Sequence, residues 1–292
     1  NMRYVYVLSI RDDNTFLVMT IISATVLRKN DPDAEIMVVV DENTDLEQFP
    51  EELALLNRIM LSIHVIVTGY IDSVLSSRFI KLSLPNVVND SFWYLDSDTL
   101  PLVSLNVPDI ECDIGLVRDL NMAEHSYGLG SSRVLDCELM NWPIPKYPYY
   151  NSGVIFVNVN RSVIDLFGQA KTLWLAAVEN EIRCGDQLPL NIAIQRASDI
   201  RVQLLDDSYN AQIRVAPKLA STAKIIHIFS GSLAKHNDTV LHALIGGWRD
   251  ERVLKYDIID RLMKTRNPWL RGTKQSRLFP IRKLLSLFRA PF

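Results

Sequence analysis

Apolar residues along the chain alternate between short runs and longer stretches. The short runs are rich in β-branched and aromatic residues, which is typical of buried strands. They lie at residues 4–10, 35–41, 62–68, 92–95 and 113–119. The longer stretches between them have the length and apolar spacing of helices. They lie at residues 16–29, 51–61 and about 71–88. This alternation predicts an α/β fold with a mostly parallel central sheet and helices on both faces.

The pattern breaks between residues 120 and 150. The stretch NWPIPKYPYY has three prolines and three tyrosines, so it cannot form a regular element and reads as an active-site loop or lid. Strand and helix patterns then resume. We expect strands at residues 151–159 and 224–229, and helices at 163–180, 186–195 and 238–247, the last closed by its two glycines.

Composition places the chain among ordinary globular proteins, with 48% hydrophobic and 22% charged residues. The three cysteines are an odd number without paired spacing, which argues against a disulfide framework or a zinc ribbon and favours a reducing cytoplasm. The first apolar run ends at Arg11 and reads as a strand, not a signal peptide. No stretch approaches the roughly 18 apolar residues of a membrane span.

Charge is distributed unevenly. Residues 261–292 hold nine basic and no acidic residues, which leaves 22 basic and 34 acidic residues in the remainder. We therefore expect a catalytic domain over residues 1–250 and a basic, amphipathic helical tail over residues 251–292.

The tail interleaves bulky apolar residues with arginine and lysine, the pattern of a helix that lies on an anionic bilayer. The alternative is a C-terminal helix packed on the domain with solvated charges. Nucleic acid is not expected as a partner, because the acidic body would oppose it. One apolar face would contain Leu278, Phe279, Ile281, Leu284, Leu285, Leu287 and Phe288.

Two carboxylates, Asp96 and Asp98, follow directly on the apolar run at 92–95. Left bare in a half-buried site they would repel each other, which favours a cation between them. Mg²⁺ and Mn²⁺ prefer such oxygen ligands and keep positions open for substrate phosphates. Ligands of parallel sheets bind at the carboxyl ends of the strands, where Asp96 and Asp119 both fall. The alternative is a solvated turn, in which Asp and Ser are common.

A different enzyme class uses similar residues. Haloacid-dehalogenase phosphatases have Asp-x-Asp-x-Thr after an apolar strand, with the first Asp as nucleophile. Here Thr99 comes one place early and Leu100 holds the required position. That motif also normally follows the first strand and not the fourth, so we favour a diphosphate-binding metal site.

Four motifs in this order make the chain resemble glycosyltransferase family 8. They are YLDSDTL, YYNSGVIFVNV, DQLPLN and IIHIFSGSLAK, and the likeness spans about residues 4–235. The family includes bacterial lipopolysaccharide galactosyl- and glucosyltransferases and the glycogenins. The resemblance implies a GT-A fold, a nucleotide-sugar donor that is usually a UDP-sugar, Mn²⁺ (or Mg²⁺), and retention at the anomeric carbon.

The resemblance also implies roles for individual residues. The metal ligands would be Asp96, Asp98 and His227, and Asp186 and Gln187 would lie next to the anomeric carbon. The residues implied to bind the donor are Asp12, Asn14, Lys81, Asp96, Asp119, Asn151, Gly231 and Lys235.

Several positions depart from the family pattern. Thr15 stands where the family has a tyrosine that stacks on the base, although Phe16 could substitute for it. Lys81 replaces an arginine, and it supplies charge but not a bidentate fork. Leu188 replaces the second Asp of the family's Asp-Gln-Asp motif. Gly231 and Lys235 also lie four and eight residues after His227, where the family usually has three and six.

Three of these residues have simpler structural interpretations. His227 could be a packed histidine in an apolar strand. Asp186 could serve simply as a helix cap, and Asn151 simply as part of the turn that begins a strand. The catalytic role of Gln187 rests wholly on the resemblance.

The expected function is a metal-dependent, retaining hexosyltransferase that uses UDP-glucose or UDP-galactose. The acceptor would be a saccharide or glycolipid in bacterial surface polysaccharide synthesis, and the enzyme would work at the inner face of the plasma membrane. Because an amide is a poor nucleophile, we expect same-face attack and not a covalent intermediate. The alternatives are the phosphatase described above and a nucleotide-sugar-binding protein without transferase activity.

Overall fold

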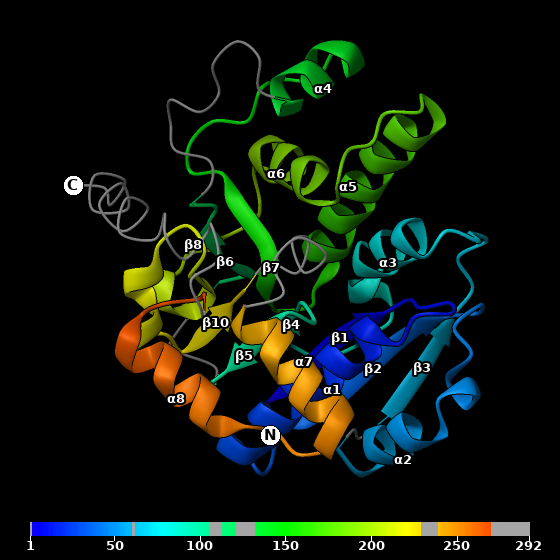
Figure 1. The fold of residues 1–292 in the computed structure, drawn as a ribbon. Coiled ribbons are helices and arrows are strands. Elements are labelled where there is room, and N and C mark those ends of the chain that lie inside the picture. The colour runs from blue at the N-terminus through cyan, green and yellow to red at the C-terminus, as the bar shows by residue number, and fades with distance from the viewer. Residues whose placement is uncertain (1, 60–61, 106–111, 121–131, 229–238, 270–292) are drawn as a thin grey trace.

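The computed structural model describes residues 2–59, 62–105, 112–120, 132–228 and 239–269. Its main feature is a seven-stranded sheet in the order β3-β2-β1-β4-β7-β6-β8 (Figure 1). The strands are β1 (Arg3–Leu8), β2 (Glu35–Asp41), β3 (Ser62–Ile66), β4 (Phe92–Leu95), β6 (Ile114–Arg118), β7 (Tyr150–Val157) and β8 (Val202–Leu204). Among these strands only β7 runs antiparallel to its neighbours, so the expected mostly parallel sheet is confirmed.

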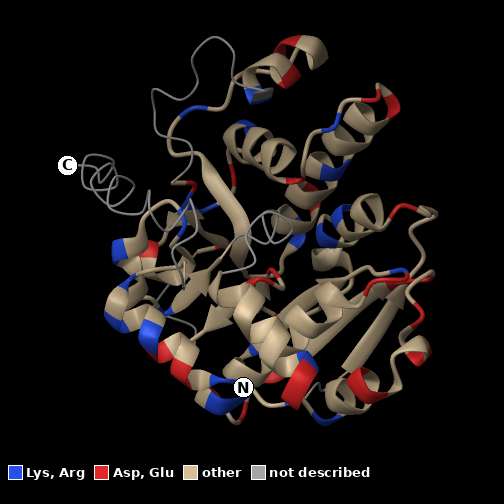
Figure 2. Cartoon of the chain, in the orientation of Figure 1, with Lys and Arg blue, Asp and Glu red and all other residues tan. Residues whose placement is uncertain are grey.

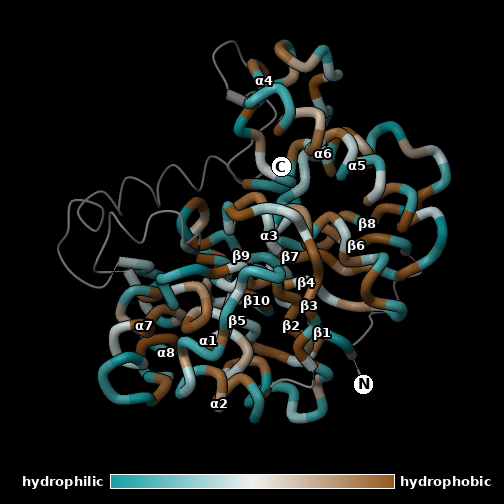
Figure 3. The backbone as a smooth tube through the Cα atoms, turned by 90° about the vertical axis from the view of Figure 1, so that its right-hand side faces the viewer, coloured by the Kyte–Doolittle hydropathy of each residue, from teal (hydrophilic) through white to brown (hydrophobic). Residues whose placement is uncertain are grey.

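Helices cover both faces of this sheet because side chains of each strand alternate between two cores. On β1, Tyr4 and Tyr6 belong to one core with the buried residues of α1, α7 and α8. Val5 and Val7 face the other core, which α3, α5 and α6 complete. Figure 3 shows the hydrophobic colour concentrated on the strands between these layers. The helices are α1 (Thr15–Asn30), α2 (Pro50–Ile59), α3 (Ser73–Lys81), α4 (Ser132–Met140), α5 (Arg161–Glu179), α6 (Gln187–Arg196), α7 (Val240–Glu251) and α8 (Tyr256–Thr265).

A small second sheet has the order β5-β10-β9. It consists of β5 (Thr99–Pro101), β9 (Ala211–Gln212) and β10 (Ile225–His227). The chain passes from β4 in the large sheet to β5 in the small one through residues 96–98. The carboxylate pair therefore lies where the two sheets meet.

Three local predictions need correction. The stretch from residue 120 to residue 150, predicted to be irregular, contains the helix α4. The predicted helix at 71–88 ends at Lys81, and a separate 3₁₀ turn at Leu84–Asn86 follows because Pro85 cannot donate a backbone hydrogen bond. Helix α7 continues through its glycines to Glu251 and ends at Arg252, whose φ of 54° is left-handed.

The described part of the predicted tail packs on the body. Helix α8 buries Ile258, Ile259 and Leu262 in the same core as α1, and its charged residues of both signs lie outward (Figure 2). The predicted membrane-binding face at residues 278–288 lies outside the described residues. Within the described part of the chain, no helix has the length and apolar content needed to cross a membrane.

Candidate active site

Asp96, Asp98 and His227 form one cluster at the junction of the two sheets. Each offers one ligand atom, and these atoms lie within 4.8 Å of one another. The Nε2 atom of His227 is 3.2 Å from an oxygen of Asp98 and 3.9 Å from an oxygen of Asp96. The antiparallel register of β10 and β5 pairs His227 with Thr99, which carries the imidazole to the carboxylates. The combination of two carboxylates and an imidazole suits a divalent cation such as Mn²⁺.

The imidazole is oriented for metal binding. Its Nδ1 atom lies 2.9 Å from Oδ1 of Asn210, whose amide nitrogen donates to Asn151 at 2.8 Å. Because an amide oxygen only accepts, Nδ1 of His227 carries a proton. In the neutral imidazole Nε2 then offers its lone pair on the side of the carboxylates, where a cation would bind. Asn151 accepts a second bond from the backbone N–H of Gly153 at 2.9 Å. These outer contacts fix the ring as they do in metal centres.

The backbone of Gly153 forms one wall of this cluster. A Cβ atom at this position would lie 2.2 Å from Cε1 of His227 and 2.8 Å from Oδ2 of Asp96. The absence of a side chain at Gly153 is therefore a requirement of the cluster, and the residues present fit a bound divalent cation.

Electrostatics of the cluster also favour a cation. Burial raises the pKa of Asp96, and the neighbouring Asp98 raises it further, against the opposing effect of Lys81. Burial alone would lower the pKa of His227, but the hydrogen bond and charge of Asp98 and the charge of Asp96 raise it. The protein thus holds two carboxylates together at a free-energy cost that positive charge relieves.

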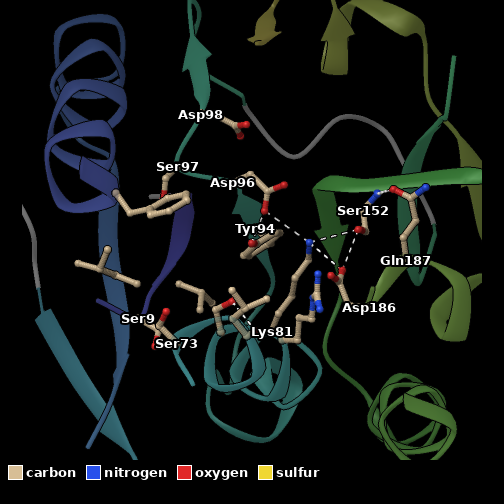
Figure 4. A pocket seen from close by; sticks show the side chains of 16 residues that line it. Ser9, Ser73, Lys81, Tyr94, Asp96, Ser97, Asp98, Ser152, Asp186 and Gln187 are labelled. Atoms are coloured by element: carbon tan, nitrogen blue, oxygen red, sulfur yellow. Dashed lines mark hydrogen bonds and ion pairs between the residues drawn. The ribbon is translucent and has the colours of Figure 1, made fainter. Parts of the chain in front are cut away.

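Lys81 connects the cluster of Asp96, Asp98 and His227 to Asp186. Its ammonium lies 2.9 Å from Asp186, 3.4 Å from Asp96 and 3.2 Å from the hydroxyl of Ser152 (Figure 4). Burial opposes the charge of Lys81, but Asp186 and Asp96 outweigh it and raise its pKa. Burial likewise opposes ionisation of Asp186, yet Lys81 and Ser152 lower its pKa. A charged Lys81–Asp186 pair therefore lies beside the cation site.

Asp186 holds the position before the first residue of α6 but makes no capping hydrogen bond. Its side chain instead accepts a bond from Ser152 at 2.8 Å. The interpretation of Asp186 as only a helix cap is therefore wrong, because its carboxylate points into the site.

Gln187 is held at both ends of its amide. Its nitrogen donates to Asp119 at 2.7 Å, and its oxygen accepts from the backbone N–H of Ser152 at 3.1 Å. The structure thus brings together most of the residues that the sequence singled out. They are Lys81, Asp96, Asp98, Asp119, Asn151, Asp186, Gln187 and His227; their roles toward a donor stay predictions.

A cavity of about 340 Å³ opens beside these residues. Figure 4 places Ser9 and Ser73 at one end and Asp186 and Gln187 at the other. The cavity also contacts Phe16, which is 49% exposed.

Four of the described residues that were predicted to bind the donor do not line this cavity. Asp119 contacts Gln187, and Asn151 contacts Asn210. Asp12 is exposed, and the side-chain oxygen of Asn14 accepts a hydrogen bond from Arg249. Gly231 and Lys235 lie outside the described residues.

Sequence reasoning missed four residues of the site. A glycine inside a strand indicates a close approach to other atoms, so Gly153 was detectable. No sequence pattern marks Tyr94 or Ser152 as part of the site. The hydroxyl of Tyr94 donates to Asp96, and that of Ser152 donates to Asp186. Asn210 lies in a short 3₁₀ turn that apolar periodicity does not reveal.

Leu100, which takes the place of the phosphatase motif's threonine, is buried in β5. The hydroxyl group that the phosphatase motif requires at this position is therefore absent, which argues against the phosphatase interpretation.

Comparison by sequence alone finds no matching family model and no matching curated protein. Comparison of structures finds glycosyltransferases. The bifunctional glycosyltransferase WbbM matches with a TM-score of 0.58 and 15% identity over 97% of this chain and 52% of its own. GlyE of Streptococcus pneumoniae TIGR4 matches with a TM-score of 0.56 and 17% identity, over 93% of this chain and 66% of its own.

The galactosyltransferase LgtC, in complex with donor and acceptor sugar analogs, matches with a TM-score of 0.55 and 15% identity. The match covers 94% of this chain and 99% of LgtC, whereas the chain spans about half of the WbbM structure. At such identities the likeness establishes the architecture. The chain therefore has the GT-A fold of these glycosyltransferases.

Proposed function

We propose that the protein is a glycosyltransferase that moves a hexose from a nucleotide sugar to a saccharide or glycolipid acceptor. The observation that carries this proposal is the cluster of Asp96, Asp98 and His227 beside the cavity that Asp186 and Gln187 also line. The resemblance to family 8 supports UDP-glucose or UDP-galactose as the donor and retention as the outcome.

Asp96, Asp98 and His227 would hold Mn²⁺ or Mg²⁺. When bound there, the metal would act as a Lewis acid toward the diphosphate. The chain's own residues supply rigidity. Lys81 holds Asp96 and Asp186 at fixed positions, and the amide of Gln187 is engaged by Asp119 and Ser152. A preorganised site of this kind stabilises a transition state without reorganising during the reaction.

We propose same-face attack by the acceptor hydroxyl. The bond from the anomeric carbon to the phosphate oxygen breaks, and the bond to the acceptor oxygen forms on the same face. The acceptor's proton passes to the departing diphosphate. Gln187 is a poor nucleophile whose amide is already hydrogen-bonded at both ends, so no covalent intermediate is required. Detection of a hexose attached to the protein by mass spectrometry would overturn this mechanism.

We also propose that the enzyme works at the inner face of a bacterial plasma membrane, on glycolipids of surface polysaccharides. This proposal rests on the basic composition of residues 261–292 and on the resemblance. Binding of the full chain, but not of a chain ending at residue 269, to anionic vesicles would support it. Equal binding by both chains would refute the role of the tail.

The first experiment measures release of nucleoside diphosphate from a panel of nucleotide sugars, with Mn²⁺ and with chelator. We expect slow hydrolysis of one UDP-sugar that chelator abolishes and that Asp98→Ala reduces at least about 100-fold, because the variant lacks a metal ligand. Asp33→Ala, at an exposed site between α1 and β2, is the matched control and should keep full activity.

Three other outcomes would change the conclusion. Metal-dependent UDP binding without release from any donor would indicate a nucleotide-sugar-binding protein. Turnover of a generic phosphatase substrate without a nucleotide sugar would indicate a phosphatase. No release and no metal-dependent UDP binding would mean that the likeness covers the fold alone.

A further inference from the structure

One edge of the large sheet is open to solvent. In the order β3-β2-β1-β4-β7-β6-β8, β3 is a terminal strand, and among the described residues it pairs with β2 alone. Figure 1 places β3 at the outer side of the molecule, away from β8. An edge strand presents a row of backbone N–H and C=O groups without a neighbouring strand, so it can pair with a further strand.

The β3 edge lacks the features that normally prevent such pairing. Residues 62–71 contain no acidic residue, lysine, arginine or proline, although charge and proline are the usual protection of a strand edge. The side chains of Val65, Val67 and Ile71 are instead 66%, 77% and 86% exposed. Apolar, β-branched side chains therefore face solvent along this edge, where their burial against another strand would be favourable.

The opposite edge of the same sheet is protected. Strand β8 has only three residues, with Arg201 directly before it and Asp206 and Asp207 shortly after it. A short strand between charged residues is a poor template for strand addition. The contrast between the two edges indicates that the β3 edge is an interaction surface.

The β3 edge is complementary to itself. In an antiparallel pair about a twofold axis at Val65, this residue lies opposite its own copy, and Ile63 lies opposite Val67 of the second copy. All three side chains lie on one face of the sheet, because side chains alternate along a strand. Cross-strand pairs of β-branched residues stabilise a sheet, and no like charges meet in this register.

Charges at the two ends of β3 favour the same arrangement. Arg58 lies exposed in the last turn of α2, shortly before β3 begins. After β3 ends, Glu42 accepts hydrogen bonds from the backbone N–H groups of Thr68 and Gly69, and Asp72 begins α3. Figure 2 shows acidic residues at the end of the sheet where β2 and β3 finish. Antiparallel pairing brings the basic end of one strand to the acidic end of the other, which gives electrostatic complementarity.

We propose that the β3 edge joins two copies of this chain in an antiparallel, twofold-symmetric pair centred on Val65. The large sheet then continues from one copy into the other. Twofold dimers are the commonest homo-oligomers, and each copy contributes the same surface. A single pair of strands buries little surface, so we expect a dissociation constant in the micromolar range. This proposal is independent of the proposed function.

The first test is sedimentation velocity of the full chain at tens of micromolar, where we expect the mass of two copies. Val65→Lys sets two ammonium groups opposite each other across the axis, so this variant should have the mass of one copy. Leu204→Lys is the matched control, because Leu204 is 46% exposed in β8 at the other edge. It should remain a dimer, and chemical unfolding should show that both variants are folded.

A second test reports the register. Opposite residues of an antiparallel pair have Cα atoms about 4.5–5.5 Å apart, which a disulfide can span. Val65→Cys should therefore form a covalent dimer under mild oxidation. The thiols of Val67→Cys would lie four residues apart along the strands, at about 14 Å, and should not react with each other. The native cysteines, which are Cys112, Cys137 and Cys184, are buried and do not interfere.

Each outcome decides for or against the β3 edge. A wild-type protein with the mass of one copy overturns the proposal. A dimer that persists in Val65→Lys overturns it as well, because another surface then joins the copies. A dimer that is lost equally in Leu204→Lys has the same consequence. Equal cross-linking of Val65→Cys and Val67→Cys overturns the twofold register.

Discussion

Replacement of Gly153 by alanine is a steric test of the metal site. The added Cβ would lie 2.2 Å from Cε1 of His227 and 2.8 Å from Oδ2 of Asp96. Carbon atoms in contact stay about 3.5–4.0 Å apart, so the imidazole ring must move by more than about 1 Å. Gly153 does not have a left-handed φ, so alanine causes no backbone strain and the effect is confined to this clash.

The size of the expected effect follows from that displacement. His227 is fully enclosed, ends β10 and is bonded to Asn210, so the ring cannot move without breaking its support. Metal ligands tolerate departures of only about 0.2 Å from their usual distances. We therefore expect Gly153→Ala to weaken Mn²⁺ binding at least about 100-fold. Overpacking should also lower the free energy of unfolding by about 1–3 kcal/mol.

The assay is calorimetric titration with Mn²⁺, together with chemical unfolding to confirm that the variant is folded. Gly168→Ala is the matched control, because Gly168 lies in α5 and an added Cβ meets no atom within 4 Å. Alanine there should leave Mn²⁺ binding unchanged and stabilise the helix by about 0.5–1 kcal/mol. A folded Gly153→Ala protein with wild-type Mn²⁺ affinity would show that His227 and Asp96 are not the ligands.

Two further predictions concern buried charge. Lys81→Met removes the ammonium group that is paired with Asp186 and Asp96. The free energy of unfolding should therefore fall by about 3–5 kcal/mol, and turnover of the nucleotide sugar should be lost. Lys81→Arg keeps the positive charge and should have nearly the wild-type free energy of unfolding. Burial opposes ionisation of Asp41, but Arg11, Ser9 and Thr44 lower its pKa, so its ionised form stabilises the fold above about pH 4 and this contribution disappears as the pH falls through the folded-state pKa. Asp41→Asn should lower the free energy of unfolding by about 1–3 kcal/mol at pH 7. In urea unfolding, the difference in this free energy between wild type and Asp41→Asn should become smaller below about pH 4. A difference that stays constant with pH would contradict the stabilising role of the Asp41 carboxylate.

The architecture was predictable because apolar periodicity reports which residues are buried. The runs at 4–10, 35–41 and 92–95 became the central strands β1, β2 and β4. Strand direction is not encoded in this periodicity, so nothing in the pattern distinguished β7 as the antiparallel strand. Helix α4 was missed because the prolines and tyrosines at its end dominated that stretch.

The site was only partly predictable, since its residues come from turns and strand ends. Asp96 and Asp98 were detectable as acids directly after a buried strand. His227 was assigned through the resemblance, because a histidine in an apolar run gives no signal of its own. Its contact with Asn210 depends on how two turns pack, which no local pattern specifies.

The position of the cluster between two sheets has a consequence for folding. Asp96 directly follows β4 of the large sheet, whereas His227 is the last residue of β10 in the small sheet. The two residues are widely separated in the sequence. Contacts between such distant segments form slowly, because a long loop must close first. A metal ion at this cluster would therefore not nucleate the fold, because its ligands come together only once both sheets are in place. Since such an ion would bind the native state alone, it would stabilise the contact between the two sheets by mass action.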